Sequence, residues 1–276
     1  MKFRLIFIVV CCFLFLVPYL IYQRHMHNLR APDVAPVLFE NAPQMKLTTM
    51  ADTKSMAEAF QKANEPIYLA HFPSDFASQG TPELFVQALL PYIHFYNQQV
   101  MTDRQQLIAI ANKLWAHQSL TQAETERFFQ LEKFYDVTGE ADAGTAFHLL
   151  EKINVIPPTV ALAVALEETK GGKEYLDAPF GVFVWDDNKR YVRASYPDLS
   201  QAYYAWFYQL NTADAHASFR EMRQQWVSPK PYVGYFLLKH LRSLRPYDEN
   251  YTDILSDTYT KYQLLRLEEK DEENTP

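Results

Sequence analysis

The segment 156–172 constrains the fold more than any other part of the chain. It reads Ile-Pro-Pro-Thr-Val-Ala-Leu-Ala-Val-Ala-Leu-Glu-Glu-Thr-Lys-Gly-Gly. A proline pair suits the first turn of a helix, and a glycine pair suits the end of one. The residues between them are small and apolar in every direction, which is typical of a buried helix rather than a surface helix. The sequence therefore predicts one short buried helix, against which the rest of the core packs.

Two carboxylates, Glu167 and Glu168, occupy the last turn of this predicted helix. A helix C-terminus carries partial negative charge, so an acid at that position is expected to have a raised pKa. A carboxyl group of this kind beside a cleft can serve as a general acid. Adjacent acids at a helix end are also commonly only solvated, so this pattern leaves both interpretations open.

Composition favours a helical globular protein. The 276 residues are 48% hydrophobic and 15% aromatic, which excludes wholesale disorder and leaves room for one or two domains. Only 7 glycines occur, which favours helices over a turn-rich β fold.

Residues 5–22 are almost wholly apolar and follow Lys2 and Arg4. This length approaches a membrane span and exceeds the usual core of a signal peptide, and no small-residue cleavage signal follows it. We therefore expect an uncleaved single-pass anchor with its amino terminus in the cytoplasm, although Arg24 and Arg30 on the far side weaken that orientation. Both cysteines, at 11 and 12, lie within this segment, so the remainder cannot form a disulfide.

The part after the anchor is acidic. With the four basic residues of the first thirty set aside, 22 basic and 33 acidic residues remain, a net charge of −11. This balance argues against nucleic acid and anionic lipid surfaces as partners.

The expected organisation follows from the pattern along the chain. Residues 1–30 form the anchor, 31–50 a proline-containing linker, 51–140 a helical leader, 141–265 the main domain and 266–276 an acidic tail. In the leader, Thr81 and Pro82 begin a helix that Pro91 is expected to kink or interrupt, and Asp103 and Arg104 are expected on a solvated face.

A β-rich stretch follows the Glu-bearing helix. Residues 180–185 and 191–193 favour strands, and Asp-Asp-Asn-Lys at 186–189 favours the turn of a hairpin. Helical patterns resume from 199 to 267. The predicted fold is mainly α (α+β), a helical body with a small β-hairpin lobe, which is the layout of lysozyme-like glycosidases.

Several segments resemble one bacterial family over roughly residues 84–265. Residues 158–172 resemble the motif P-S-L-x-L-A-Q-A-A-x-E-S-G-W-G, Phe180-Gly181 resembles L-F-G, and residues 205–212 resemble A-Y-M-x-N-L-N-T. Residues 219–223 are similar to L-R-x-x-R, and residues 244–251 to L-x-x-Y-S-E-R-G-x-x-Y. These motifs are those of the glucosaminidases of glycoside hydrolase family 73, in the membrane-associated branch called Bax.

The resemblance implies a peptidoglycan hydrolase, an endo-β-N-acetylglucosaminidase that cleaves cell-wall glycan. Its motif assigns the general acid to Glu168, with Glu167 as the fallback if the register shifts by one. It implies no cofactor, and the sequence contains no metal-ligand motif. It also implies a bacterial inner-membrane protein whose domain lies in the periplasm.

Other site residues follow from the same motifs. A second catalytic group is expected at His216 or Asp177, unless the substrate's own acetamido group takes that role. The predicted substrate-binding residues are Phe180, Gly181, Phe183, Trp206 and Asn211.

Three departures from the family pattern favour an alternative. The tryptophan of E-S-G-W-G is Gly171, a frequent tryptophan after L-F-G is Phe183, and the tyrosine expected after N-T-x-x-A is His216. The alternative is a catalytically weak or inactive, membrane-tethered module that binds glycan or an envelope partner.

Overall fold

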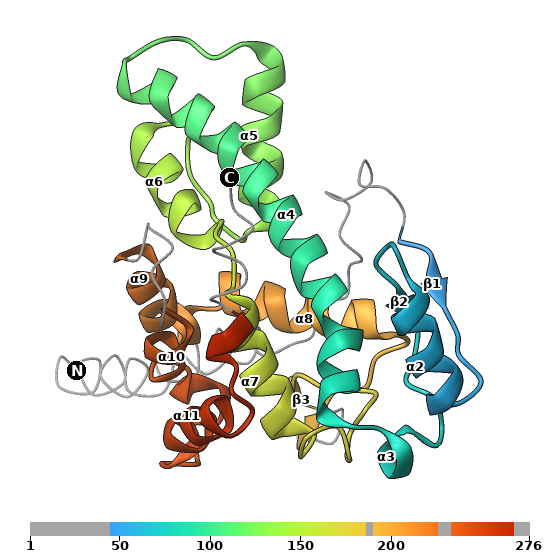
Figure 1. Ribbon diagram of the computed structural model, residues 1–276. Coiled ribbons are helices and arrows are strands. Elements are labelled where there is room, and N and C mark those ends of the chain that lie inside the picture. Colours follow the sequence, from blue (N-terminus) through green and yellow to red (C-terminus); the bar gives the residue numbers. More distant parts are fainter. Residues whose placement is uncertain (1–44, 186–189, 226–232, 268–276) are drawn as a thin grey trace, which may run out of the picture.

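The computed structural model describes residues 45–185, 190–225 and 233–267, and within these ranges the protein is mainly helical (Figure 1). The predicted anchor at 5–22 lies outside the described residues, as do most of the linker and of the acidic tail. Among the helices that are described, none has both the length and the apolar character needed to cross a bilayer.

Helix α7 (Pro158–Glu168) is the buried helix that the sequence predicts. It begins at the second proline of the pair, and nine of its eleven residues are buried. It packs against α4 (Pro82–Trp115), α10 (Val233–Leu238) and α11 (Tyr251–Lys261). Beyond its end the chain turns through Gly171 and Gly172, which both have positive φ angles. The prediction of a central apolar helix with proline and glycine at its two ends is confirmed.

Helix α4 is the longest element, with 34 residues, and it runs diagonally through the molecule (Figure 1). Thr81 caps it, accepting a hydrogen bond from the backbone N–H of Leu84 at 3.3 Å. Pro91 lies inside the helix without ending it, so the expected interruption is wrong. The lost hydrogen bond is offset because Leu89, Tyr92 and Ile93, on either side of the proline, are fully buried.

The far half of α4 carries α5 (Gln122–Phe134) and α6 (Ala143–Lys152), which form the upper part of Figure 1. Because both pack on α4, the expected solvated face at 103–104 is wrong. Asp103 is only 5% exposed and accepts hydrogen bonds from Arg127 and from the Tyr135 hydroxyl. Arg104 donates to the carbonyl oxygens of Leu150 and Ile153 at 2.5 and 2.7 Å.

Two small sheets complete the fold. Strands β1 (Leu47–Thr48) and β2 (Tyr68–Leu69) pair in parallel beside α2 (Thr53–Lys62) and α3 (Phe76–Gln79), a pairing that the sequence did not predict. Strands β3 (Phe183–Trp185) and β4 (Tyr191–Arg193) form the predicted antiparallel pair, with Val184 opposite Val192.

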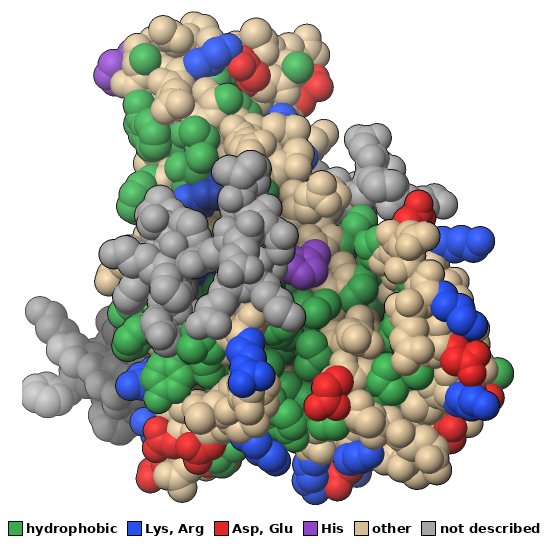
Figure 2. Space-filling view, viewed as in Figure 1, with side chains coloured by type: hydrophobic (Ala, Val, Ile, Leu, Met, Phe, Trp, Pro, Cys, Tyr) green, Lys and Arg blue, Asp and Glu red, His purple; other side chains and the backbone are tan. Residues whose placement is uncertain are grey.

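The chain after the hairpin returns to the helical body. It forms α8 (Leu199–Thr212), the short 3-10 helix η2 (Asp214–His216), α9 (Ala217–Gln225), α10, the 3-10 helix η3 (Arg242–Leu244) and α11. Of these, α10 and α11 pack against α7, and the β3–β4 pair lies near the end of α7 in Figure 1. On the face drawn in Figure 2, acidic and basic side chains are interspersed along the lower edge, where α7 and α11 end.

Candidate functional site

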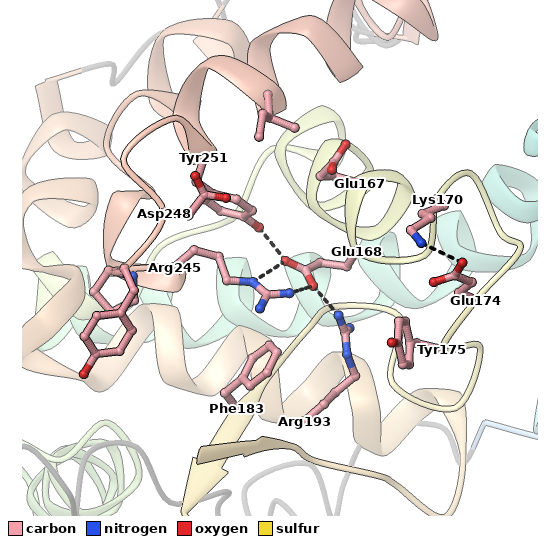
Figure 3. Close-up of a pocket in the computed structure, with 13 residues that line it drawn as sticks. Glu167, Glu168, Lys170, Glu174, Tyr175, Phe183, Arg193, Arg245, Asp248 and Tyr251 are labelled. Atoms are coloured by element: carbon pink, nitrogen blue, oxygen red, sulfur yellow. Dashed lines mark hydrogen bonds and ion pairs between the residues drawn. The ribbon is translucent and has the colours of Figure 1, made fainter. Parts of the chain in front are cut away.

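A pocket of about 600 Å³ opens at the C-terminal end of α7. The end of α7, the loop that follows it, the β3–β4 pair and the segment from η3 into α11 build its wall (Figure 3). It is lined by Glu167, Glu168, Lys170, Glu174, Tyr175, Phe183, Arg193, Arg245, Pro246, Tyr247, Asp248, Tyr251 and Ile254.

Glu168, the last residue of α7, is held from three directions (Figure 3). Its Oε2 accepts a hydrogen bond from Nη2 of Arg193 at 2.6 Å and another from Nη2 of Arg245. Its Oε1 accepts from Nε of Arg245 at 3.0 Å and from the Tyr251 hydroxyl at 2.9 Å. Arg245 therefore binds both oxygens in the fork geometry that guanidinium and carboxylate groups favour.

Four donors on one carboxylate are the arrangement of an ionised acid, which only accepts hydrogen bonds. Burial and the neighbouring Glu168 raise the pKa of Tyr251 well above its ordinary value, so its hydroxyl keeps its proton and donates. The Glu168 side chain is 2% exposed, and two guanidinium groups face one carboxylate.

Gly181 makes room for this cluster. A Cβ at position 181 would lie 2.3 Å from both Cδ and Oε2 of Glu168, and the φ angle of +60° also favours glycine. Only a residue without a side chain allows the loop before β3 to approach the carboxylate this closely. Gly181, which the sequence analysis assigned to substrate binding, therefore contacts Glu168 directly.

Aromatic rings contact the guanidinium groups of Arg193 and Arg245, which also bind Glu168. The guanidinium of Arg245 lies 4.1 Å from the ring centre of Phe183, and that of Arg193 lies 4.3 Å from the ring centre of Tyr175. Each distance is within the range of a cation–π contact. Tyr175 is 53% exposed and Tyr247 is 87% exposed, so two aromatic rings of the pocket wall also face solvent.

Glu167 also lines the pocket but is held differently. One of its oxygens accepts a hydrogen bond from the Thr258 hydroxyl of α11 at 2.8 Å. Figure 3 draws no bond from Glu167 to either arginine, and its side chain points away from the Glu168 cluster. The two adjacent acids at the end of α7 therefore have distinct surroundings.

His216 and Asp177 are not among the lining residues. His216 is 1% exposed and its Nδ1 lies 2.6 Å from the Ser243 hydroxyl oxygen. Burial, with a smaller contribution from Arg220, lowers the pKa of His216 to about 3, so its ring is neutral near pH 7. Asp177 is exposed and accepts a hydrogen bond from the Ser195 hydroxyl at 2.8 Å. The structure does not bring either predicted group to the pocket.

The predicted substrate-binding residues divide into two groups. Phe183 lines the pocket and Gly181 packs against Glu168. Phe180 and Trp206 are buried and stack on one another with ring centres 5.3 Å apart, and Asn211 is fully buried. The motif aromatic residues Phe180 and Trp206 therefore belong to the core beneath the site rather than to its surface.

Sequence reasoning assigned no site role to Arg193, Arg245, Tyr251, Tyr175 or Tyr247. One signal pointed toward three of them, because the motif at 244–251 contains Arg245, Tyr247 and Tyr251. Arg193 and Tyr175 gave no signal, because a single arginine in a strand or a single tyrosine in a loop is common.

Among the described residues, no group of three or more His, Cys, Asp or Glu side chains is placed to hold a metal ion. A scan against known protein families, a search of curated proteins and a search of solved structures each found no match for this chain.

Proposed function

We propose that the pocket at the end of α7 binds a glycan strand of bacterial peptidoglycan, and that the chain is a membrane-tethered glycan-binding module. The observation that carries this proposal is the state of Glu168. Both of its oxygens accept hydrogen bonds from Arg193, Arg245 and Tyr251, so neither presents a proton to a ligand.

A general acid must hold a proton on an oxygen that faces the leaving group. A carboxylate that accepts four hydrogen bonds, three of them from cations, offers no such oxygen. In this arrangement Glu168 positions the two arginines, and the arginines in turn order Phe183 and Tyr175 on the pocket wall. The cluster acts as a framework for binding.

The shape and lining of the pocket support a saccharide ligand. Binding pockets typically combine aromatic surface with a few fixed polar groups. Tyr175 and Tyr247 present exposed rings, whose negative faces attract the C–H groups of a sugar ring. Arg193, Arg245 and Asp248 provide donors and an acceptor for hydroxyl and acetamido groups. The motif resemblance and the predicted anchor support the cell-wall glycan as the particular saccharide.

A second candidate is the glucosaminidase that the resemblance implies. It is favoured by one observation: Glu168 lies in the pocket at the junction of the helical body and the β3–β4 pair, where a lysozyme-like enzyme holds its acid. Turnover then requires Arg245 to withdraw when substrate binds. Glu167 is the other acid at this position, and the Thr258 hydroxyl is its hydrogen-bond donor.

The test uses the full chain in detergent, incubated with purified peptidoglycan. The binding proposal predicts that the wild type sediments with peptidoglycan and releases no fragment that mass spectrometry detects. Release of fragments with new reducing-end N-acetylglucosamine by the wild type, but not by Glu168→Gln or Glu167→Gln, would instead establish the hydrolase and identify its acid. Folded protein that neither sediments nor releases fragments contradicts both candidates.

A further inference from the structure

A second depression, of about 360 Å³, adjoins the pocket of Glu168. Pro246 lines both, so the two form neighbouring parts of one surface. The second depression lies between η2 and α9 on one side and the segment from α10 to η3 on the other. Its lining side chains include Lys239, His240, Arg242, Ser218 and Ser243.

The charged side chains that line this depression are positive. Lys239 and Arg242 are exposed cations, and no carboxylate is among the lining residues. Within the ranges that the structure describes, neither cation forms an ion pair. The whole chain carries a net charge of −7, so an acid-free basic depression is not a consequence of composition.

Two hydroxyl groups in the same depression are fixed by histidines. The Ser218 hydroxyl lies 2.9 Å from Nδ1 of His240, and the Ser243 hydroxyl lies 2.6 Å from Nδ1 of the buried His216. Hydroxyl groups held in place lose less entropy when they bind a ligand, and they combine with cations in binding oxyanions. The depression thus contains fixed hydroxyls beside two cations that form no ion pair among the described residues, although the Lys239 ammonium lies 5.8 Å from the ring centre of Tyr235.

We propose that this depression is an anion-binding site, and that it takes a carboxylate of the peptides carried by the glycan strand in the neighbouring pocket. The proposal rests on the proposed function for the identity of its ligand. It assigns the glycan backbone to the pocket of Glu168 and the peptide carboxylate to Lys239 and Arg242, in the neighbouring depression that Pro246 also lines. The site then distinguishes glycan that carries peptides from glycan that does not.

The first experiment compares intact peptidoglycan with the same material after enzymatic removal of its peptides, using the full chain in detergent. We expect the wild type to bind the intact form about fivefold more tightly, the size of two partly exposed ion pairs. Lys239→Ala/Arg242→Ala should lose this preference and keep the affinity for peptide-free glycan. Lys54→Ala/Arg266→Ala, which removes two exposed cations elsewhere, is the matched control and should keep the preference.

A second measurement makes the outcome independent of glycan binding. The ring protons of His240 are followed by NMR while acetate, inorganic phosphate or chloride is added at constant ionic strength. Shifts caused by acetate in the wild type, and absent from the Lys239/Arg242 variant, support the site. A response to phosphate alone, or equal responses in both proteins, overturns it. If no protein binds either glycan form, the proposed function fails, and the acetate titration then decides the anion site by itself.

Discussion

The backbone of Gly181 lies against the carboxylate of Glu168, so closely that a Cβ at position 181 would lie 2.3 Å from Oε2. Glu168 ends the buried helix α7, and Gly181 lies shortly before β3. The conformations of these two segments therefore depend on each other. Any side chain at 181 must displace Glu168 and, through it, the hydrogen bonds to Arg193 and Arg245.

Gly181→Ala should therefore destabilise the protein and weaken glycan binding together. We expect the free energy of unfolding to fall by about 2–4 kcal/mol, from left-handed backbone strain and from the disrupted ion pairs. Urea denaturation measures the change. Gly144→Ala on α6 is the control: its Cβ would make an ordinary contact of 3.5 Å, and it should stabilise by about 0.5–1 kcal/mol. Equal effects at both positions would contradict the coupling.

The two adjacent acids should respond differently to neutralisation. Glu168→Gln takes the buried carboxylate away from two partly buried guanidinium groups, which should cost about 2–4 kcal/mol of stability. Glu167→Gln keeps an amide oxygen for the Thr258 hydroxyl and should cost about 1 kcal/mol or less. Chemical denaturation of the two variants tests this order. A Glu168→Gln protein as stable as the wild type would show that the carboxylate is not the centre of the cluster.

His216 should make stability depend on pH. Its pKa is lowered to about 3 by burial, whereas in the unfolded chain it is near its ordinary value of 6.5. Between these values the unfolded chain binds the extra proton, so stability is fully present above pH 6.5 and falls as the pH decreases toward 3. The contribution is about 1.4 kcal/mol per pH unit.

His216→Gln should remove that slope. Between pH 7 and pH 4, the stability of the wild type relative to the variant, measured by denaturation, should fall by about 1.4 kcal/mol for each pH unit below 6.5, whatever the difference between the two at pH 7. The carboxylates that also titrate in this range are shared by both proteins, so the difference isolates the histidine. Parallel curves for the two proteins would show that position 216 takes no proton on unfolding.

Tyr247 should contribute to glycan affinity without contributing to folding. Its ring is 87% exposed on the pocket wall, so Tyr247→Ala removes almost no buried surface. We expect glycan affinity to fall about three- to tenfold, the size of one aromatic contact. Phe147→Ala on α6 removes another exposed ring, 55% exposed and outside the pocket, and should leave affinity unchanged in the same sedimentation assay.

Asp103 should be structural. Burial raises the pKa of its carboxyl group, while Arg127 and Tyr135 oppose that shift by stabilising the charged form. Asp103→Ala removes the acceptor of the Tyr135 hydroxyl and the anion beside Arg127, which keeps Gln106 as an acceptor, and should cost about 2–4 kcal/mol in a denaturation experiment. Glu126→Ala, an exposed acid on α5, should change stability by less than about 0.5 kcal/mol. Similar losses for both would place Asp103 on a solvated face after all.

Local patterns of the sequence predicted the buried helix, the β3–β4 pair and one residue of the pocket. Pro158 and the glycine pair mark the two ends of α7, and Thr81 caps α4 as predicted. These signals can be recognised in the sequence because each acts within a few residues, through backbone hydrogen bonds and steric limits. They also marked Glu168 as a residue of interest, since an acid at the end of a buried helix requires compensation.

Only the tertiary structure decided how that acid is compensated. Arg193, Arg245 and Tyr251 reach Glu168 from positions 25, 77 and 83 residues away in sequence. Burial of His216 and Asp103 likewise depends on helices that pack from elsewhere in the chain. The sequence determines which charges and rings exist, whereas their state depends on distant groups that only the folded chain brings together. The hydrogen bonds that Glu168 accepts from Arg193, Arg245 and Tyr251 have this physical origin.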